Sequence, residues 1–355
     1  MVYNNREISV LVVDDSAFMR VALKKIIEEE GNIRVIDVAR NGEEALKKIK
    51  KYKPDLVTLD IEMPVMDGLT TLKIIMKESP LPVIMISSLT EEGATATLEA
   101  LNSGAVDFIP KGGKSFVNLD IVKIGEQLRQ KIRSIVVQGR LDKIAPSNRK
   151  HDSFKTIKRD EVQEKCGIVA LGVSTGGPLA LQKLIPMLPS DLPSSVVIVQ
   201  HMPPNFTKPF ANRLNQLSDI EVKEVQEGDT TKPGTVFIAP GGKHLLFKAL
   251  SGNKLRMHLS DEPENTLFRP SVDVMMLSLV SVYKSRILGV IMTGMGNDGL
   301  QGMQKIKERG GITIAQNEDT CVVYGMPKVC VDTGIIDHVL PLDVIAEGIV
   351  NCTVS

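Results

Sequence analysis

Short apolar runs alternate with longer amphipathic segments along this 355-residue chain, and this alternation limits the folds that it can adopt. In the first half the apolar runs are four to six residues long and rich in β-branched residues, which is typical of parallel strands buried on both faces. They are Ile8–Val13, Val35–Ala39, Leu56–Leu59, Val83–Ser87 and Val106–Ile109. Helical spacing of apolar residues marks the segments between them, which are Ala17–Glu30, Gly42–Lys51, Gly68–Lys77 and Glu91–Asn102. The pattern predicts a doubly wound, flavodoxin-like α/β domain, which binds ligands at the carboxyl ends of its strands.

A second α/β pattern begins at Gly167. The expected strands are Ile168–Val173, Ser195–Val199, Gly234–Ala239 and Leu288–Thr293. The expected helices are Leu179–Leu188, Lys208–Gln216, Val272–Val282, Leu300–Glu308 and Leu342–Val350. His244–Lys248 and Leu255–Leu259, joined by a turn around Gly252, predict a β-hairpin. We therefore expect a second α/β domain with a parallel sheet.

The two patterns are separated by a polar stretch. Helical spacing continues after Ile124 and ends near Ile135, and Gln138–Glu164 is rich in Lys, Arg, Asp, Ser and Asn. A chain of this length exceeds one ordinary hydrophobic core. The predicted organisation is a first domain over residues 1–127, a helix extension and interdomain linker over 128–165, and a second domain over 166–355.

Composition excludes several classes of protein. A formal net charge of zero argues against a large nucleic-acid surface, which normally carries a basic excess. The four Cys residues lack a C-x-x-C spacing and a secreted disulfide pattern, so we expect them to be reduced. No apolar run is long enough to span a bilayer, and the polar segment Met1–Glu7 does not have the pattern of a signal peptide. These features predict a cytoplasmic protein without membrane insertion.

Polar residues lie at the carboxyl ends of four strands of the first domain. Asp14 and Asp15 follow the first strand and Asp60 ends the third, so the fold brings three carboxylates to one edge, where oxygen ligands suit Mg²⁺. Ser87 and Lys111 follow the fourth and fifth strands. A single surface Asp is most often a solvated loop residue or a helix cap, but the whole set at matching strand ends favours a phosphoryl-accepting site.

In the second domain, Gly172-Val-Ser-Thr-Gly-Gly-Pro178 leads from a strand into a helix. Two interpretations stay open for this motif: a phosphate cradle at a helix N-terminus, or a turn that presents Ser174 as a nucleophile. It matches neither the dinucleotide-binding spacing, nor the P-loop, nor the nucleophile elbow of α/β-hydrolases.

A histidine and an aspartate follow two other strands of this domain. His201 follows Val196–Gln200, and Asp298 lies in Thr293-Gly-Met-Gly-Asn-Asp-Gly299. Taken alone, His201 would more often be a core residue and Asp298 the cap of the next helix. Ser, His and Asp at three carboxyl ends supply the nucleophile, base and orienting acid of acyl transfer. His244 and His258, on the predicted hairpin, are poorer candidates, and His151 and His338 have no comparable setting.

Both domains resemble known families. The first resembles the receiver domain of bacterial response regulators in Asp14-Asp15, Asp60-Ile-Glu-Met-Pro-Val-Met-Asp-Gly68, Ser87 and Phe108-Ile-Pro-Lys111. This resemblance implies that Asp60 accepts phosphate from a histidine kinase. It also implies that Asp14, Asp15, Asp60 and the Glu62 carbonyl hold Mg²⁺, that Ser87 and Phe108 form the switch pair, and that Lys111 contacts the phosphate.

The second domain is similar to the catalytic domain of chemotaxis protein-glutamate methylesterases, the CheB family. The similarity lies in the Ser174, His201 and Asp298 motifs, in Phe268-Arg-Pro-Ser-Val-Asp273 and in Cys321-Val-Val-Tyr-Gly-Met-Pro327. It implies Ser174 as nucleophile, His201 as general base and Asp298 as its orienter. Thr175 and the Met295 N–H would lie at the oxyanion and substrate site, and the esterase domain would need no cofactor.

The combined resemblance implies a phosphorylation-activated esterase in chemotaxis adaptation. Its substrates would be glutamyl methyl esters on the cytoplasmic domains of chemoreceptors, hydrolysed with release of methanol, and its phosphodonor a chemotaxis histidine kinase. Deamidation of receptor glutamines stays open, because it uses the same nucleophile. A phosphorylation-controlled scaffold without turnover and a nucleotide-binding regulator are the competing hypotheses, and a DNA-binding output domain is disfavoured.

Overall fold

The computed structural model describes residues 7–111, 119–144, 157 and 165–353, and the chain divides into two compact units, Met1–Ala145 and Pro146–Ser355. Each unit is described by itself. No helix in the described ranges is both long enough and apolar enough to cross a bilayer. All four cysteines are buried and free, as expected for reduced thiols.

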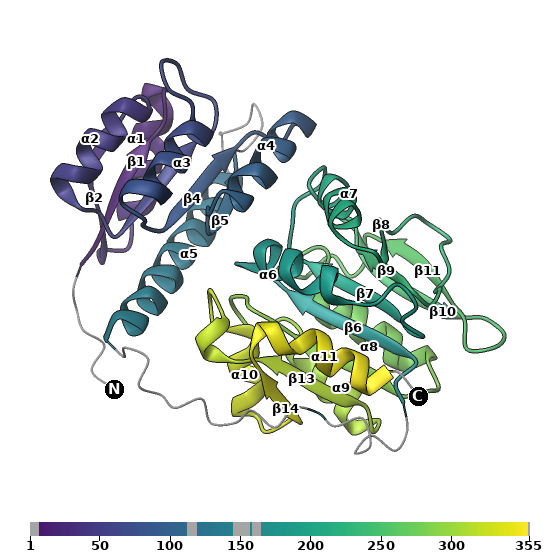
Figure 1. Cartoon of the computed structure of the whole chain (residues 1–355). Coiled ribbons are helices and arrows are strands. Elements are labelled where there is room, and N and C mark those ends of the chain that lie inside the picture. Colours follow the sequence, from purple (N-terminus) through teal and green to yellow (C-terminus); the bar gives the residue numbers. More distant parts are fainter. Residues whose placement is uncertain (1–6, 112–118, 145–156, 158–164, 354–355) are drawn as a thin grey trace. The chain divides into compact units, whose positions relative to one another are not determined.

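The first unit is built on a five-stranded parallel sheet in the order β2-β1-β3-β4-β5 (Figure 1). Its strands are β1 (Ile8–Val13), β2 (Ile33–Ala39), β3 (Leu56–Asp60), β4 (Val83–Ser87) and β5 (Asp107–Pro110). Every residue of β3 and of β4 is buried, which explains why most of them are apolar. The strand order reverses between β1 and β3, and Asp14 and Asp60 stand at the carboxyl ends of these two strands. In a doubly wound sheet this reversal marks the place where ligands bind.

Helices cover the sheet of the first unit. They are α1 (Ala17–Glu28), α2 (Gly42–Tyr52), α3 (Gly68–Glu78), α4 (Glu91–Asn102) and α5 (Leu119–Ile144). The first four start where a side-chain oxygen accepts a backbone N–H of the first turn, which is the usual N-cap arrangement. The capping residues are Ser16, Asn41, Asp67 and Thr90. The helix α1 packs against α5, and α3 packs against both α2 and α4.

Helix α5 differs from the prediction, because it continues through Gln138 to Ile144, where the sequence predicted the linker to begin. Gln, Arg, Leu and Lys are good helix formers, and extending an existing helix costs little, so the helix persists where apolar spacing no longer marks it. The rest of the predicted linker, including His151, lies outside the described residues except Ile157 and Lys165. Ile157 is buried, and its carbonyl accepts a hydrogen bond from Asn351 Nδ2 at 2.9 Å.

The second unit contains a seven-stranded sheet in the order β14-β13-β12-β6-β7-β9-β8, and all its pairs are parallel. Its strands are β6 (Ile168–Val173), β7 (Ser195–Gln200), β8 (Glu221–Glu224), β9 (Thr235–Ile238), β12 (Ile287–Ile291), β13 (Ile312–Gln316) and β14 (His338–Leu340). The chain winds outward from β6 in both directions, so the strand order reverses between β6 and β12. The Ser174 motif follows β6 and the Asp298 motif follows β12, on the two sides of this reversal.

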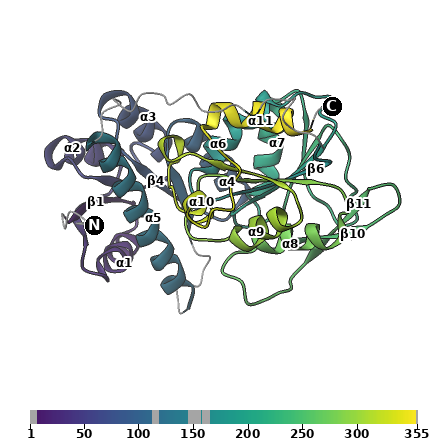
Figure 2. The ribbon, with the colours of Figure 1, turned by 90° about the horizontal axis from the view of Figure 1, so that it is seen from below.

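Helices lie on both faces of this sheet. They are α6 (Gly177–Leu184), α7 (Thr207–Leu217), α8 (Val272–Val282), α9 (Leu300–Glu308), α10 (Met326–Asp332) and α11 (Leu342–Thr353), with short 3-10 helices at Ile185–Met187 and Glu318–Thr320. In Figure 2, α6, α7 and α11 lie on one side of the strands, and α8 and α9 lie on the other. The α8–α9 and α6–α11 pairs are in direct contact. Most residues of α8 are apolar because this helix packs against a core of residues from β6, β7, β12 and the hairpin.

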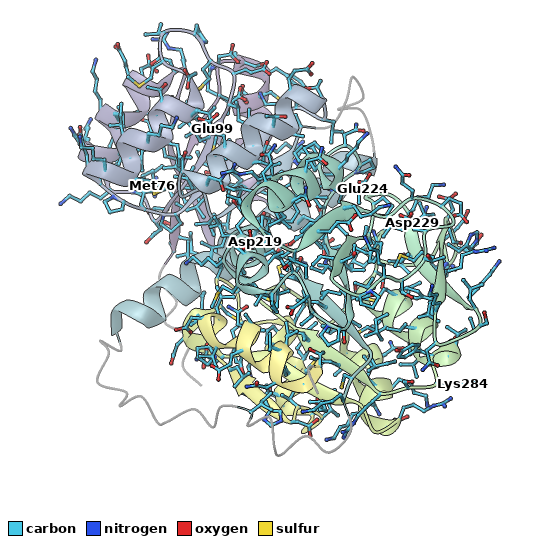
Figure 3. All side chains as sticks on the ribbon, turned by 45° about the vertical axis from the view of Figure 1, so that its right-hand side comes forward. Met76, Glu99, Asp219, Glu224, Asp229 and Lys284 are labelled. Carbon is cyan, nitrogen blue, oxygen red and sulfur yellow. The ribbon has the colours of Figure 1, made fainter. Side chains whose placement is uncertain are left out.

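The predicted hairpin is present as β10 (His244–Ala249) and β11 (Leu255–Ser260), which pair antiparallel in a separate two-stranded sheet. The strands β8, β13 and β14 and the helix α10 were not predicted. β8 lies at an edge of the large sheet, where polar side chains are tolerated: Glu224, labelled in Figure 3, accepts a hydrogen bond from Thr207 Oγ1 at 2.6 Å. Nearby Asp229, also labelled there, accepts hydrogen bonds from Lys223 Nζ at 3.0 Å and Gln226 N at 2.8 Å.

Candidate active site

Ser174 lies directly after β6, at the start of a tight turn into α6. Its N–H donates to Thr293 O at 3.0 Å, and its carbonyl accepts from Gly177 N at 2.8 Å. Gly176 has φ +75°, a backbone conformation that suits glycine, and Pro178 occupies the first turn of α6. The serine is thereby held between a strand end and a helix start, and it is 9% exposed.

His201 follows β7, the neighbour of β6, and its backbone N–H donates to Val173 O at 3.2 Å. The Nδ1 atom of its ring lies 3.1 Å from Ser174 Oγ, and the Nε2 atom lies 2.8 Å from Asp298 Oδ2. The structure therefore brings together the serine, histidine and aspartate that the sequence placed at three strand ends. They form a continuous hydrogen-bonded chain.

The Asp298 carboxylate accepts hydrogen bonds from four donors. Besides His201 Nε2, they are Ser271 Oγ at 2.8 Å, Val272 N at 2.7 Å and Asp273 N at 2.9 Å. Burial alone would raise the pKa of Asp298, but the hydrogen bond and charge of His201 and the N–H groups at the start of α8 lower it below its ordinary value. Asp298 is therefore held as an anion.

The charge on Asp298 determines which nitrogen of His201 carries the proton. An ionised carboxylate only accepts hydrogen bonds, so Nε2 must donate to it, and in the neutral ring Nδ1 is left with a lone pair. This lone pair faces Ser174 Oγ. The arrangement is that of a general base ready to take the hydroxyl proton.

Gln200, the last residue of β7, joins the backbones of the serine and the histidine. Its Nε2 atom donates to Ser174 O at 3.0 Å and to His201 O at 3.1 Å, and the side chain is 2% exposed. Its Oε1 atom accepts no hydrogen bond from any residue that the structure describes. One buried amide therefore fixes the spacing between the nucleophile and the base.

Gly294 lies against Ser174 from the other side of the strand reversal. A Cβ atom at this glycine would lie 2.8 Å from Ser174 Cβ and 2.3 Å from Met326 Sδ. This close approach places the loop that contains Met295 beside the serine. The side chain of Thr175, the next residue after Ser174, is buried, and its carbonyl accepts from Thr293 Oγ1 at 2.9 Å. Both predicted oxyanion residues are thus adjacent to Ser174 in the fold.

Phe268 stacks on the ring of His201, with ring centroids 4.0 Å apart and an angle of 12° between the planes. It belongs to the segment Asp261–Pro270, which connects β11 to α8. Phe268 lies in a motif of the family resemblance, but no role could be predicted for it, because periodicity does not show which rings come into contact.

His244, which the sequence ranked as a poor catalytic candidate, is fully buried beside this segment. Its Nδ1 atom accepts from Ser271 N at 3.3 Å, and its Nε2 atom lies 3.2 Å from both Pro263 O and Thr266 Oγ1. Burial lowers the pKa of His244. The neutral ring ties the connecting segment to the start of α8, and it does not contact Ser174.

Asp273, in the first turn of α8, faces the start of α9. Its Oδ1 atom accepts from Gly302 N at 2.8 Å. Burial, together with the nearby charge of Asp298, raises the pKa of Asp273 to about 6. No role in the site was predicted for Gln200, Phe268, Ser271 or Asp273, and His244 was ranked as a poor candidate. Phe268, Ser271 and Asp273 lie in one motif of the family resemblance, and Ser271 also had a local signal, as a serine directly before an apolar helix.

In the first unit, the three predicted acids meet at the reversal of the sheet. One carboxylate oxygen from each of Asp14, Asp15 and Asp60 lies within 4.8 Å of the others. Lys111 Nζ donates to Asp60 Oδ2 at 2.6 Å and lies 3.2 Å from Asp14 Oδ2. Burial, aided by the Asp14 charge, raises the pKa of Asp60 to about 6 despite this lysine.

The cluster has the features that a small divalent cation requires. Asp14 Oδ2 is buried and faces Lys111 Nζ at 3.2 Å, and the clustered carboxylates offer oxygen ligands from two strand ends. Three carboxylates close to this one lysine, together with the raised pKa of Asp60, indicate negative charge that is incompletely compensated by protein groups. These residues fit Mg²⁺.

Ser87 and Phe108, the predicted switch pair, end β4 and lie in β5, two neighbouring strands. Ser87 Oγ donates to Gly93 O at 3.0 Å and accepts from Thr97 Oγ1 at 2.7 Å, so it is hydrogen-bonded to α4. Phe108 is 5% exposed. The serine therefore links the strand end nearest Asp60 to the helix beside it.

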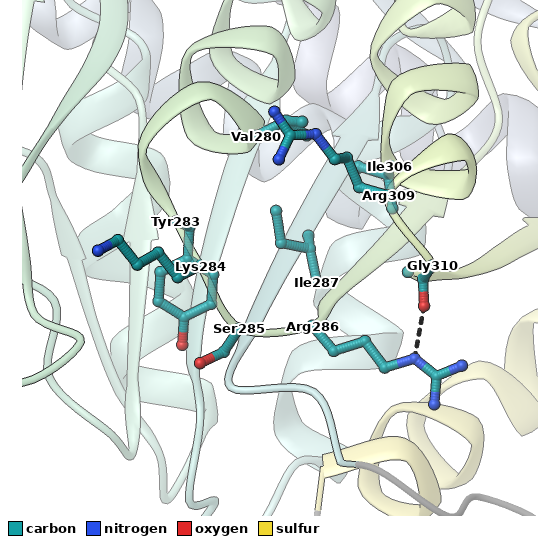
Figure 4. A pocket seen from close by; sticks show the side chains of 10 residues that line it. Val280, Tyr283, Lys284, Ser285, Arg286, Ile287, Ile306, Arg309 and Gly310 are labelled. Atoms are coloured by element: carbon teal, nitrogen blue, oxygen red, sulfur yellow. Dashed lines mark hydrogen bonds between the residues drawn. The ribbon is translucent and has the colours of Figure 1, made fainter.

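A cavity of about 360 Å³ in the second unit contains none of the triad residues. As Figure 4 shows, it is lined by residues from the end of α8, the start of β12 and the end of α9, including Lys284, Arg286 and Arg309. The dashed line in that figure joins Arg286 Nε to Gly310 O, which are 2.6 Å apart. This cavity lies at the amino end of β12, opposite the strand ends that carry Ser174 and Asp298.

The two units define a class of protein. One is a doubly wound domain with a cluster of three carboxylates at its strand reversal, and the other is a parallel-sheet domain with a serine–histidine–aspartate chain at its carboxyl edge. The class is a response regulator with a hydrolase output domain.

Comparison with known proteins identifies the families that the two units match. Residues 10–117 match the response regulator receiver domain, and residues 169–349 match the CheB methylesterase family. The chain belongs to the CheB methylesterase family, which confirms the predicted resemblance and fold class. The protein-glutamate methylesterase/protein-glutamine glutaminase of Lawsonia intracellularis is 47% identical over 351 residues, covering 96% of this chain and 98% of that protein. The protein of the same name from Archaeoglobus fulgidus is 47% identical, with coverage of 96% and 97%.

A solved structure gives the same assignment for the second unit. The crystal structure of the Thermotoga maritima CheB methylesterase catalytic domain is 45% identical in sequence, with a TM-score of 0.51. The match covers 52% of this chain and 97% of that one.

Proposed function

We propose that this protein is a phosphorylation-activated protein-glutamate methylesterase that hydrolyses glutamyl methyl esters on chemoreceptors. The observation that carries the proposal is the chain of hydrogen bonds from Ser174 through His201 to Asp298. Ester hydrolysis by a serine commonly uses a nucleophile, a general base and an orienting acid that are hydrogen-bonded in this order. The near full-length relatives carry the name of this activity.

In the acylation half of the reaction, His201 Nδ1 takes the proton of Ser174 Oγ while Oγ bonds to the γ-carbonyl carbon of the methylated glutamate. The backbone N–H groups of Thr175 and Met295 stabilise the negative charge that develops on the carbonyl oxygen. One such donor is commonly worth about 3–4 kcal/mol. The tetrahedral intermediate collapses, and methanol leaves with the proton from His201.

In the deacylation half, His201 takes a proton from water, which attacks the acyl-serine. The new intermediate releases a glutamate side chain and returns the proton to Ser174. Asp298 remains ionised throughout and stabilises the imidazolium that forms in each half. The esterase unit needs no cofactor for these steps.

The same groups support a second reaction, deamidation of receptor glutamines, which is named in the titles of the relatives. Ammonia is a poorer leaving group than methanol, so protonation by His201 contributes more to this reaction. We propose it as a slower activity of the same serine.

The receiver unit controls this chemistry through Asp60, which we propose accepts a phosphoryl group from a chemotaxis histidine kinase. Asp14, Asp15, Asp60 and the Glu62 carbonyl would hold Mg²⁺, which neutralises charge on the transferred group when it is bound. Lys111, already paired with Asp60, would then contact the phosphoryl oxygens. Ser87 and Phe108 would relay the change, because Ser87 exchanges its hydrogen bonds with α4 for one to the phosphoryl group.

The partners of the protein are therefore the methylated cytoplasmic domains of chemoreceptors and the kinase. Both place its action in the cytoplasm. Neither partner requires nucleic-acid binding or membrane insertion.

Methanol release from methylated receptor membranes tests the proposal, with and without a small phosphodonor plus Mg²⁺. Wild type should release methanol faster with the phosphodonor, Ser174→Ala should release none, and Asp60→Asn should lose the response. Ser281→Ala, which removes an exposed hydroxyl from α8, is the matched control and should behave as wild type. Absence of release from wild type in every condition would favour a phosphorylation-controlled scaffold.

A further inference from the structure

The face of the His201 ring is covered by an aromatic side chain. Phe268 lies parallel to the imidazole at a centroid distance of 4.0 Å, while the two ring nitrogens are engaged by Ser174 and Asp298. Phe268 therefore contacts the catalytic base through its π face and leaves both of its hydrogen bonds intact.

The position of Phe268 is fixed from both ends of its segment. The Arg269 carbonyl accepts from Gly242 N at 3.0 Å, and Arg269 Nη1 lies 3.5 Å from Asp261 Oδ1. On the other side, buried His244 is hydrogen-bonded to Pro263 O and to Ser271 N. A segment held in this way can place one ring with precision against another.

Leu267, the residue before Phe268, is exposed to solvent instead. Leu267 is 83% exposed, whereas Phe268 is partly buried. The segment as a whole is thus not packed into the core. Within this segment, Phe268 is turned toward the catalytic histidine, on which it stacks.

We propose that Phe268 is a positioning residue that stabilises the protonated form of His201 during catalysis. The proposal rests on the function proposed above. When His201 takes the serine proton it becomes an imidazolium, and a cation is attracted to the negative face of an aromatic ring. The attraction exists only after proton transfer, so it lowers the barrier more than it stabilises the resting enzyme.

Several charged groups act on the same imidazolium. Asp298, at the start of α9, is hydrogen-bonded to it. Asp273 of α8 lies behind Asp298, and Arg269 and Asp261 lie in the segment that contains Phe268. A variant that keeps all four groups and changes only the aromatic face therefore isolates the effect of Phe268.

Phe268→Leu is that variant, because leucine covers the imidazole with apolar atoms but has no π face. Phe268→Tyr retains the face and is the conservative control. Phe268→Met is a second apolar variant, in case leucine disturbs the fold, and thermal unfolding checks all three.

The first readout does not depend on esterase activity. The ring protons of His201 are titrated by NMR in the full chain, and their signals are assigned by their loss in His201→Gln. We expect Phe268→Leu to require a pH lower by about half a unit to protonate His201, and Phe268→Tyr to match wild type. Equal midpoints in wild type and Phe268→Leu would overturn the proposal. A higher midpoint in the leucine variant would overturn it as well, since that result would mean that Phe268 acts only by excluding water.

The second readout is methanol release. We expect Phe268→Leu to lower kcat about two- to fivefold with KM unchanged, with rescue in Phe268→Tyr. A change in KM alone would contradict the proposal and indicate a substrate contact. Inactive wild type would refute the esterase function instead, and the NMR titration separates these two failures.

Discussion

Asp298 and Asp273 join the starts of α8 and α9 by reciprocal hydrogen bonds, because each carboxylate lies at the start of one helix and accepts from the other helix. Asp298, just before α9, accepts from the first N–H groups of α8, and Asp273, in the first turn of α8, accepts from Gly302 N in the first turn of α9. The two helices also pack against each other. The carboxylate that orients His201 is therefore positioned by two helix starts rather than by a loop alone.

The hydrogen bonds of Asp298 predict a large loss of activity for Asp298→Asn. All four partners of the carboxylate are donors, so an amide NH₂ group must face at least one of them. We expect kcat to fall on the order of 10³- to 10⁴-fold, as methanol release would show, because His201 loses both its anionic partner and its tautomer.

Asp273→Asn is the matched control for this substitution. In this variant the Oδ1 atom of residue 273 still accepts from Gly302 N. Burial raises the pKa of Asp273 to about 6, so the removal of its charge should cost little stability. We expect less than about a tenfold effect on kcat. Equal losses of kcat in the two variants would mean that the hydrogen bonds between the starts of α8 and α9, and not the charge of Asp298, govern activity.

Gln200 leads to a second prediction. Gln200→Met keeps the length of the side chain but removes the donor shared by Ser174 O and His201 O. Ser174 O keeps its hydrogen bond from Gly177 N, but His201 O loses its donor, which costs about 1–3 kcal/mol, so the spacing of the two residues should relax. We expect a drop in kcat on the order of tenfold, measured as methanol release.

The control for this substitution is Gln182→Met in α6. The Nε2 atom of Gln182 is buried but makes no hydrogen bond, so its removal should leave kcat unchanged. If both methionine variants lost activity equally, general repacking would explain the result better than the loss of the shared donor.

Gly294→Ala supplies a third prediction. The added methyl group would lie 2.8 Å from Ser174 Cβ and 3.2 Å from Ser174 N, which are closer than van der Waals contact. We expect the serine to be displaced, with kcat reduced at least tenfold and stability lowered by about 1–3 kcal/mol in denaturant unfolding. Gly139→Ala, in α5, adds a methyl group with no described atom within 4 Å, so it should leave kcat unchanged and raise stability by about 0.5–1 kcal/mol, because alanine is the better helix former. An active Gly294→Ala variant would show that Ser174 tolerates movement.

The layers of both units followed from the sequence because buried parallel strands and amphipathic helices carry local signals. β1, β4, β6, α4, α8 and α9 begin and end where periodicity predicted. β8 and β14 carried no such signal, because each is short, polar in part and lies at a sheet edge. Helix α5 ended later than predicted, since helix propensity outlasted its apolar pattern.

Some residues of the site could likewise be predicted from the sequence, and others could not. Ser174, His201 and Asp298 could be predicted because each follows a strand, and the carboxyl ends of parallel strands share one edge. Gln200, Phe268 and His244 could not, because their roles depend on which atoms meet across the fold. Nothing in the spacing of Gln200 indicates that its amide reaches two carbonyls, and nothing in Phe268 indicates the histidine beneath it.

The receiver unit gives a prediction about pH and stability. Folding raises the pKa of Asp60 from its ordinary value of 3.8 to about 6, mainly through burial and also through the charge of Asp14. The folded state therefore binds this proton more tightly than the unfolded state. In the absence of metal the free energy of unfolding should fall as pH rises from about 4 to about 6, and the whole loss remains at higher pH.

Asp60→Asn removes this titration. At pH 7 without divalent metal, we expect the variant to be more stable than wild type by about 1–3 kcal/mol, as measured by chemical unfolding with a chelator present. At about pH 3 the two proteins should converge, because Asp60 is then mostly protonated in both the folded and the unfolded state. Mg²⁺ should stabilise wild type and have a smaller effect on the variant, which lacks one of the three carboxylates. A variant that is less stable than wild type at pH 7 would mean that the ion pair with Lys111 outweighs the burial of the charge.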